Sequence, residues 1–193
     1  NGGAIYFGTM SSPFLVGTDT SDNAISFTEN VAGKGGGISC TDCAAIHLEN
    51  AILLNNTAET AGGCMELHGT SKGMIKRVTF DSCKCSNGNA GALYIFASQN
   101  VKIYTSSFVN NTATKGGGGA ILWGNTERIM RTINSYDDLQ KILVILDSTE
   151  SNNHALYGNF IGSVPHSLFM QDGPADNQAT TSLPIEYKGS TIL

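Results

Sequence analysis

Five cysteines carry the most reactive side chains of this 193-residue sequence, and their spacing first raises the question of a metal site. A Cys-x-x-Cys pair and a Cys-x-Cys pair could supply thiolates to zinc, but a structural zinc site needs four converging ligands and no histidines cluster nearby. We therefore expect packed thiols with one or two disulfides, one cysteine being left over. Cys40–Cys43 and a bond from Cys64 to Cys83 or Cys85 are the candidate pairs.

Two Asn-Asn-Thr phrases are sequons for N-linked glycosylation, with Asn55 and Asn110 as the acceptors. Glu29 and Ser82 hold the matching places in neighbouring repeats, so this position should face solvent, as an acceptor must. The same phrase also suits a plain turn at a corner of the chain. The sequence therefore supports both a glycosylated asparagine in a secreted protein and an ordinary turn residue.

Acid–base catalysis would require carboxylates that converge, or a calcium cluster beside a lysine or arginine. The acidic residues are instead scattered, and Lys76-Arg77 with Asp81 is the nearest approach to a base beside an acid. A solvated surface explains that group better, because charged residues lie outside by default. The histidines share no repeat position either. We expect no catalytic, cofactor-binding or metal-binding residue, and no enzyme; the histidines are His47, His68, His154 and His166.

The composition narrows the function classes further. Charged residues make up 14% of the chain and the net charge is −5, so there is no basic footprint for nucleic acid. The longest aliphatic run, residues 142–146, is too short to span a bilayer. The sequence begins inside a repeat, and we interpret it as part of a longer protein.

A repeat built on two short motifs organises the chain. The first motif is Gly-Gly-x-aliphatic, and the second is an aromatic or aliphatic anchor followed three places later by Asn. Anchors 26, 27 and 28 residues apart, followed by a step of 38, are too regular for chance. The glycines are Gly2, Gly3, Gly35, Gly36, Gly62, Gly63, Gly118 and Gly119, with Ala90-Gly91 as a weaker copy. The anchors and asparagines are Phe27…Asn30, Leu53…Asn56, Phe80…Cys83 and Phe108…Asn111, then Leu146…Thr149.

Side chains alternate around both motifs, as in Ile38/Cys40 and Val78/Phe80, which is typical of short strands with one inward face. Three such strands per 26–28 residues bury nothing until coils stack upon each other. The pattern predicts an all-β, right-handed parallel β-helix with equivalent residues in register. Glycine provides a left-handed corner, and the asparagine amides form a ladder between coils.

Residues 1–165 should form the β-helix, with extruded loops at 8–24 and 124–141. The segment from His154 to Tyr157 is interpreted as a decayed sixth Gly-Gly copy. After Pro165 the pattern stops, so residues 166–193 are expected to be a linker and the start of a possible β-rich domain. Trp123 falls in the inward column with Phe7 and Ile95, which favours core packing over sugar binding.

The alternating motifs resemble the repeats of chlamydial polymorphic outer-membrane proteins and of large surface proteins of single-celled eukaryotes. The phrase at residues 157–165, Tyr-Gly-Asn-Phe-Ile-Gly-Ser-Val-Pro, is similar to one that ends repeat blocks in the eukaryotic proteins. The resemblance implies a non-catalytic structural or adhesive module outside the cell or at its surface, in a filament, wall or adhesin. Its expected partners are other copies or subunits, with glycans as a further candidate. The alternatives are a carbohydrate-active enzyme (a polysaccharide lyase or hydrolase) and a glycan-binding module.

Overall fold

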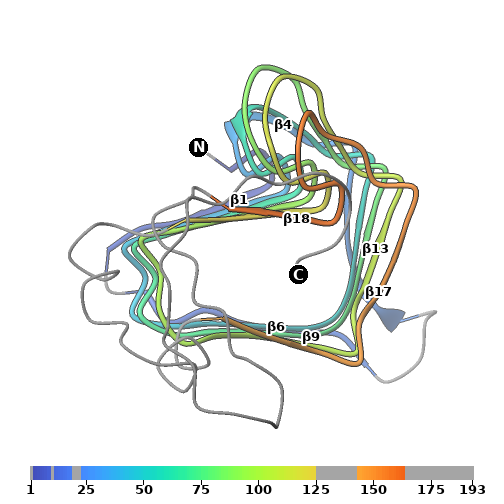
Figure 1. The fold of residues 1–193 in the computed structure, drawn as a ribbon. Helices are drawn as coiled ribbons and strands as arrows, with labels where there is room; N and C mark the ends of the chain where they lie inside the picture. Colours follow the sequence, from blue (N-terminus) through green and yellow to red (C-terminus); the bar gives the residue numbers. More distant parts are fainter. Residues whose placement is uncertain (1, 10, 19–22, 125–142, 164–193) are drawn as a thin grey trace, which may run out of the picture.

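The computed structural model describes residues 2–9, 11–18, 23–124 and 143–163, and these ranges form stacked coils of parallel strands (Figure 1). Three sheets make the walls. Sheet 1 contains β1 (Ile5–Phe7), β5 (Ile38–Thr41), β8 (Met65–His68), β11 (Leu93–Phe96), β15 (Ile121–Gly124) and β18 (Ile161–Ser163). Sheet 2 contains β2 (Phe14–Val16), β3 (Ile25–Thr28), β6 (Ile46–Leu54), β9 (Gly73–Asp81), β12 (Val101–Tyr104), β13 (Ser107–Val109), β16 (Leu143–Leu146) and β17 (Thr149–Ser151). Sheet 3 contains β4 (Val31–Lys34), β7 (Thr57–Ala61), β10 (Lys84–Cys85) and β14 (Thr112–Ala113).

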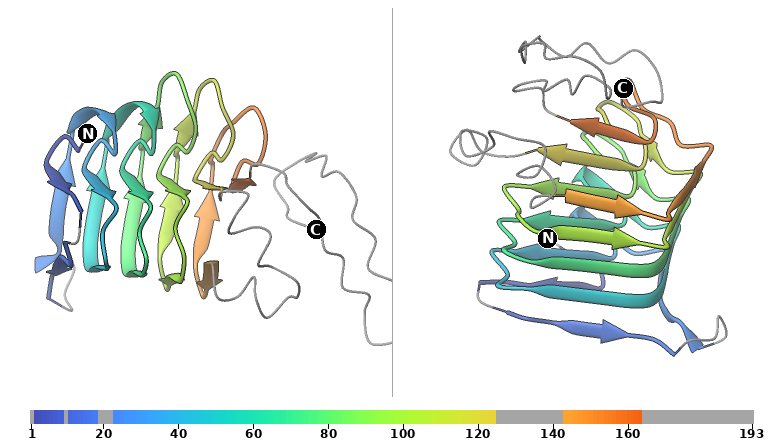
Figure 2. Two further views of the ribbon diagram at one scale, coloured as in Figure 1. Left: turned by 90° about the vertical axis from the view of Figure 1, so that its left-hand side faces the viewer. Right: turned by 60° about the horizontal axis from the view of Figure 1, so that its bottom comes forward.

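The coils wind in the right-handed sense. In Figure 1 the chain follows β6 and β9 along the bottom, rises along β13 and β17, and returns along the wall of β1 and β18. Figure 2 shows that successive coils advance along one axis as the sequence proceeds, with every strand of a wall pointing the same way. The fold class is therefore the predicted right-handed parallel β-helix.

Equivalent apolar residues lie over one another, which confirms the predicted register. In sheet 1, Ile38 pairs with Met65, Met65 with Leu93, and Leu93 with Ile121, and all four side chains are fully buried. The anchor column of sheet 2 contains the stacked rings of Phe80 and Phe108, whose centroids are 4.8 Å apart. Each coil thus places its inward side chains on those of the next coil, and the core is continuous along the axis.

Asparagine amides connect the coils at the corner after sheet 2. The backbone N–H and the Nδ2 of Asn30 both donate to Oδ1 of Asn56, at 3.0 and 2.9 Å. Asn111 makes the same pair of bonds to Asn153, and the Cys83 N–H donates to Oδ1 of Asn111. Each deeper amide also donates to the carbonyl of an anchor residue in the preceding coil. The expected ladder is present.

The left-handed residue at this corner is not the ladder asparagine, as we expected, but the residue before it. Positive φ angles of 53° to 57° occur at Glu29, Asn55, Ser82, Asn110 and Asn152. The extended backbone of the ladder residue turns its side chain inward, and the left-handed residue before it makes the bend. The corner therefore needs two residues, one for the turn and one for the amide bond.

The two glycines of the Gly-Gly motif have different tasks. The first takes a left-handed conformation in Gly35, Gly62 and Gly118, with φ between 53° and 71°. The second is required by close stacking, because a Cβ on Gly63 would lie 2.0 Å from the Gly91 carbonyl oxygen. Our sequence argument covered only the first requirement.

The last coil differs from the predicted one. Leu146 pairs with Tyr104, so the partner of the anchor Phe108 is Glu150, and the ladder residue is Asn153 rather than Thr149. Phe160 packs against Phe108 instead, with ring centroids 5.9 Å apart. The apolar run before Leu146 misled the alignment, because it fills β16, the wall before the anchor corner.

The sixth Gly-Gly copy is likewise displaced. Ile161 pairs with Ile121, so the equivalent of Gly118-Gly119 is Gly158-Asn159 and not the segment 154–157. Within the predicted loop 8–24, strand β2 adds an edge to sheet 2, which corrects the loop assignment for its residues. The predicted loop 124–141 lies, apart from Gly124, outside the described residues, as does the predicted linker at 166–193.

Candidate functional site

Two disulfides lie in the interior of the stack. Cys40 bonds to Cys43 at the corner after sheet 1, and Cys64 bonds to Cys83, which occupies a ladder position. Asn56 Nδ2 lies 3.3 Å from the sulfur of Cys64, so the disulfide continues the polar column where the amide is missing. Cys85 remains a free thiol, fully buried, and burial raises its pKa to about 11. A thiol in that state is a poor nucleophile at neutral pH.

Both sequon asparagines point away from the core. Asn55 and Asn110 are exposed, while the next residue in each case, Asn56 or Asn111, is a fully buried ladder amide. Asn110 Nδ2 donates to the Asp81 carboxylate of the preceding coil at 3.3 Å. The corner therefore separates the two asparagines of each phrase into an outward acceptor and an inward structural amide.

The outer side of sheet 1 is not the solvent face that alternation led us to expect. Ser39, Glu66 and Leu122 point outward from adjacent coils, yet each is at most 1% exposed. Sheet 3 and its turns project over this wall (Figure 1). Lys34 of β4 reaches Glu66 at 3.5 Å, and the Ser39 hydroxyl donates to it at 2.8 Å. The carboxylate is thus enclosed between a cation and a hydroxyl.

The outer side of the first half of sheet 2, by contrast, is open. One outward row runs Phe14, His47, Met74, Lys102, Val144, and the next runs Val16, Glu49, Lys76, Tyr104, Leu146. We call these ten side chains the open face. Apolar and cationic side chains alternate along it, and Phe14 is 68% exposed.

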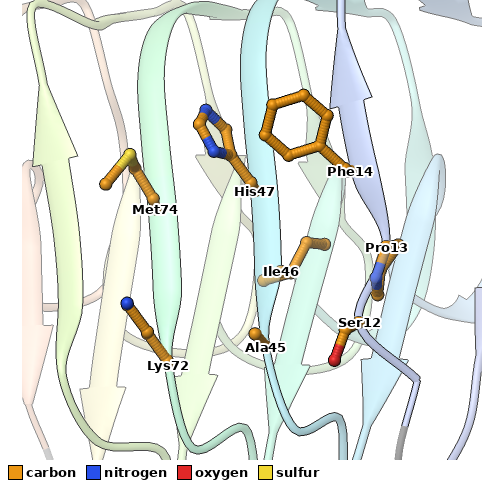
Figure 3. A pocket seen from close by; sticks show the side chains of 8 residues that line it. All are labelled: Ser12, Pro13, Phe14, Ala45, Ile46, His47, Lys72 and Met74. Carbon is orange, nitrogen blue, oxygen red and sulfur yellow. The ribbon is translucent and has the colours of Figure 1, made fainter.

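A shallow groove of about 190 Å³ lies at the N-terminal end of the open face. Phe14, His47 and Met74 stand in a row over three adjacent strands, and Ser12 and Lys72 lie beside them (Figure 3). The Phe14 and His47 rings meet edge to face with centroids 4.4 Å apart. The groove therefore combines an exposed ring, a flexible thioether, a hydroxyl and a lysine.

A cluster of charges borders this groove. The Glu49 carboxylate lies 3.0 Å from Lys76 Nζ, 2.6 Å from an Arg77 nitrogen and 2.8 Å from His47 Nε2. The hydrogen bond from Lys76, and then the one with His47, hold the pKa of Glu49 below its ordinary value. Our sequence argument grouped Lys76-Arg77 with Asp81, and the structure pairs them instead with Glu49 of the preceding coil. The register predicts this pairing, because Glu49 is 27 residues before Lys76.

The remaining chemistry-bearing residues stay apart. Within the described ranges no three His, Cys, Asp or Glu side chains come together in a way that could hold a metal ion. His68 packs beside Phe96 and Trp123 against the core, far along the chain from His47. His166 lies outside the described residues. The same part of the chain contains no helix long and apolar enough to cross a membrane.

The open face is the functional surface that sequence reasoning missed. Its signal was present as Phe14, His47 and Met74, whose spacing follows the coil length once strand β2 is recognised inside residues 8–24. Comparison of the chain with protein-family models, with curated proteins and with solved structures finds no significant match.

Proposed function

We propose that the chain is a non-catalytic structural or adhesive module of an extracellular or cell-surface protein. The observation that carries the proposal is the continuous in-register core with its amide ladder, which makes a stiff rod whose side walls are free to carry ligands. A rod of this kind can be lengthened by further coils without any change of cross-section. Such a scaffold suits a subunit of a filament, a wall or an adhesin.

Two further features support a location outside the cell. Disulfides persist in oxidising compartments, and Cys64–Cys83 closes a loop of 19 residues around a whole coil. The acceptors Asn55 and Asn110 are exposed on one corner, two coils apart, where a bulky glycan would not meet the core. The resemblance to surface-protein repeats points in the same direction.

The test is secretion of the chain from a eukaryotic cell behind an added leader. We expect a soluble product that carries glycans removable by a peptide N-glycosidase, with one titratable thiol after unfolding. Asn55→Gln and Asn110→Gln should each remove one glycan. A secreted product with neither glycans nor disulfides would contradict the extracellular assignment.

The alternative of a carbohydrate-active enzyme has one specific observation in its favour, the enclosed Glu66 carboxylate beside Lys34 and Ser39. The secreted chain should release no new reducing ends or unsaturated products from a panel of plant, algal and animal polysaccharides. Turnover that disappears in Glu66→Gln would replace the structural proposal with an enzyme.

A further inference from the structure

The charges of the chain are unevenly placed. The chain as a whole carries −5, yet four of its cations, Lys72, Lys76, Arg77 and Lys102, lie on or beside the open face against the single carboxylate of Glu49. No ion pair joins Lys72 or Lys102 to an acid within the described residues. A net positive surface on an acidic protein attracts polyanions selectively to that surface.

The three lysines form a regular array. Lys102 pairs with Met74 on the neighbouring strand, and Lys72 and Lys76 lie two residues before and after Met74. Strands about 4.8 Å apart and a rise of about 3.3 Å per residue place Lys102 about 8 Å from each of the other two, measured between Cα atoms. The array surrounds the thioether of Met74, so anionic groups on a ligand would bracket an apolar contact.

The row Phe14, His47, Met74, Lys102 crosses four coils along the axis and therefore extends for about 14 Å. Its first member is an exposed ring that stands upright against His47, with the Ser12 hydroxyl at the groove wall (Figure 3). A pyranose ring offers an apolar C–H face to such a ring and hydroxyls to the polar groups. The row thus begins with a surface for a sugar ring and ends in cations.

From this juxtaposition we infer that the open face binds a linear anionic polysaccharide lying along the β-helix axis, with one sugar unit in the groove on Phe14 and its acidic groups on Lys72, Lys76 and Lys102. A polysaccharide fits better than a lipid surface, because the groove is concave and has the volume of a small ring. The inference deepens the adhesive role proposed above by naming the ligand, and it rests on that role.

The experiment measures binding of the secreted full chain to heparin by calorimetry at two salt concentrations, with neutral dextran as the comparison. We expect binding to heparin that weakens with salt, since exposed charges are screened, and none to dextran. Lys72→Gln/Lys102→Gln should weaken the affinity at least tenfold, and Phe14→Ser should weaken it severalfold at either salt concentration.

Lys84→Gln/Lys115→Gln is the matched control, because it removes the same charge from exposed positions away from the open face. Unchanged affinity in the open-face variant, or an equal loss in the control, would overturn the inference. Tighter binding of anionic phospholipid vesicles or single-stranded DNA than of heparin would also overturn it. A chain that is secreted, glycosylated and disulfide-bonded but ignores heparin would refute the ligand alone, whereas a chain lacking those marks would refute the proposed role.

Discussion

Replacement of Asn111 by alanine tests the amide ladder most directly. Its Oδ1 accepts from the Cys83 N–H at 3.0 Å, and its Nδ2 donates to the Phe80 carbonyl at 3.0 Å and to Asn153 Oδ1 at 2.9 Å. The side chain is fully buried, so water cannot replace it. Alanine leaves the Cys83 N–H and the Phe80 carbonyl without these partners, and each unsatisfied buried group costs about 1–3 kcal/mol. We expect Asn111→Ala to lower the free energy of unfolding by about 4 kcal/mol.

Urea unfolding measures this loss. Far-UV circular dichroism follows all coils, while the fluorescence of Trp123, the one tryptophan of the chain, follows the coil next to Asn111. Both signals are needed, because stacked repeats can unfold coil by coil and a single transition must be demonstrated.

The matched control is Asn110→Gly, which removes the neighbouring side chain at an exposed position with φ of 57°. Glycine accepts that backbone conformation, so the control should change stability by less than about 1 kcal/mol. A loss in Asn111→Ala that does not exceed that of the control would refute the claim that buried amides hold the coils together.

Three further predictions concern the crosslink, the glycine corner and the charge cluster. Cys64→Ser/Cys83→Ser should cost about 3 kcal/mol, from the entropy of a loop of about 20 residues, and reducing agent should then have little further effect on the urea midpoint. Gly91→Ala should cost about 3 kcal/mol by overpacking against the next coil; Gly33→Ala, with open space at its Cβ, should be nearly neutral, and equal losses would contradict the stacking argument. The pKa of Glu49 is lowered by folding, so its contribution is present above the unfolded value of about 4.3 and is lost as pH falls through the folded pKa. Stability of the wild type and of Glu49→Gln should therefore differ at pH 7 and converge in acid; a constant gap would exclude this titration.

Periodicity was sufficient to predict the interior of the stack. A step of 26–28 residues and alternation of period two placed Ile38, Met65, Leu93 and Ile121 in one column, because in a solenoid the nearest neighbours in space are a fixed distance apart in sequence. Pairing between outward residues follows from the same rule, and Glu49 with Lys76 could have been found in this way.

The prediction failed where apolarity and hydrogen bonding pointed to different alignments. Leu146 looked like an anchor, yet its coil has Glu150 at that position and Asn153 in the ladder. Where an insertion hides the repeat length, the buried amide is the better guide, since an orphaned polar group costs more than an exposed glutamate gains by burial. The covering of Glu66 by sheet 3 was also beyond the pattern, because overhang between walls depends on turn geometry and not on period.

The axial direction of the strand-to-strand hydrogen bonds has a mechanical consequence. Tension applied to the two ends of the rod would load these bonds one coil at a time, so the stack would peel rather than shear. Each coil of about 27 residues advances the rod by about 5 Å when folded but would yield about 90 Å of chain when peeled. The Cys64–Cys83 bond keeps the residues between the two cysteines from extending, so that coil would yield only about a third of this length. The module would thus dissipate a pull in discrete slips, with a built-in stop at its centre.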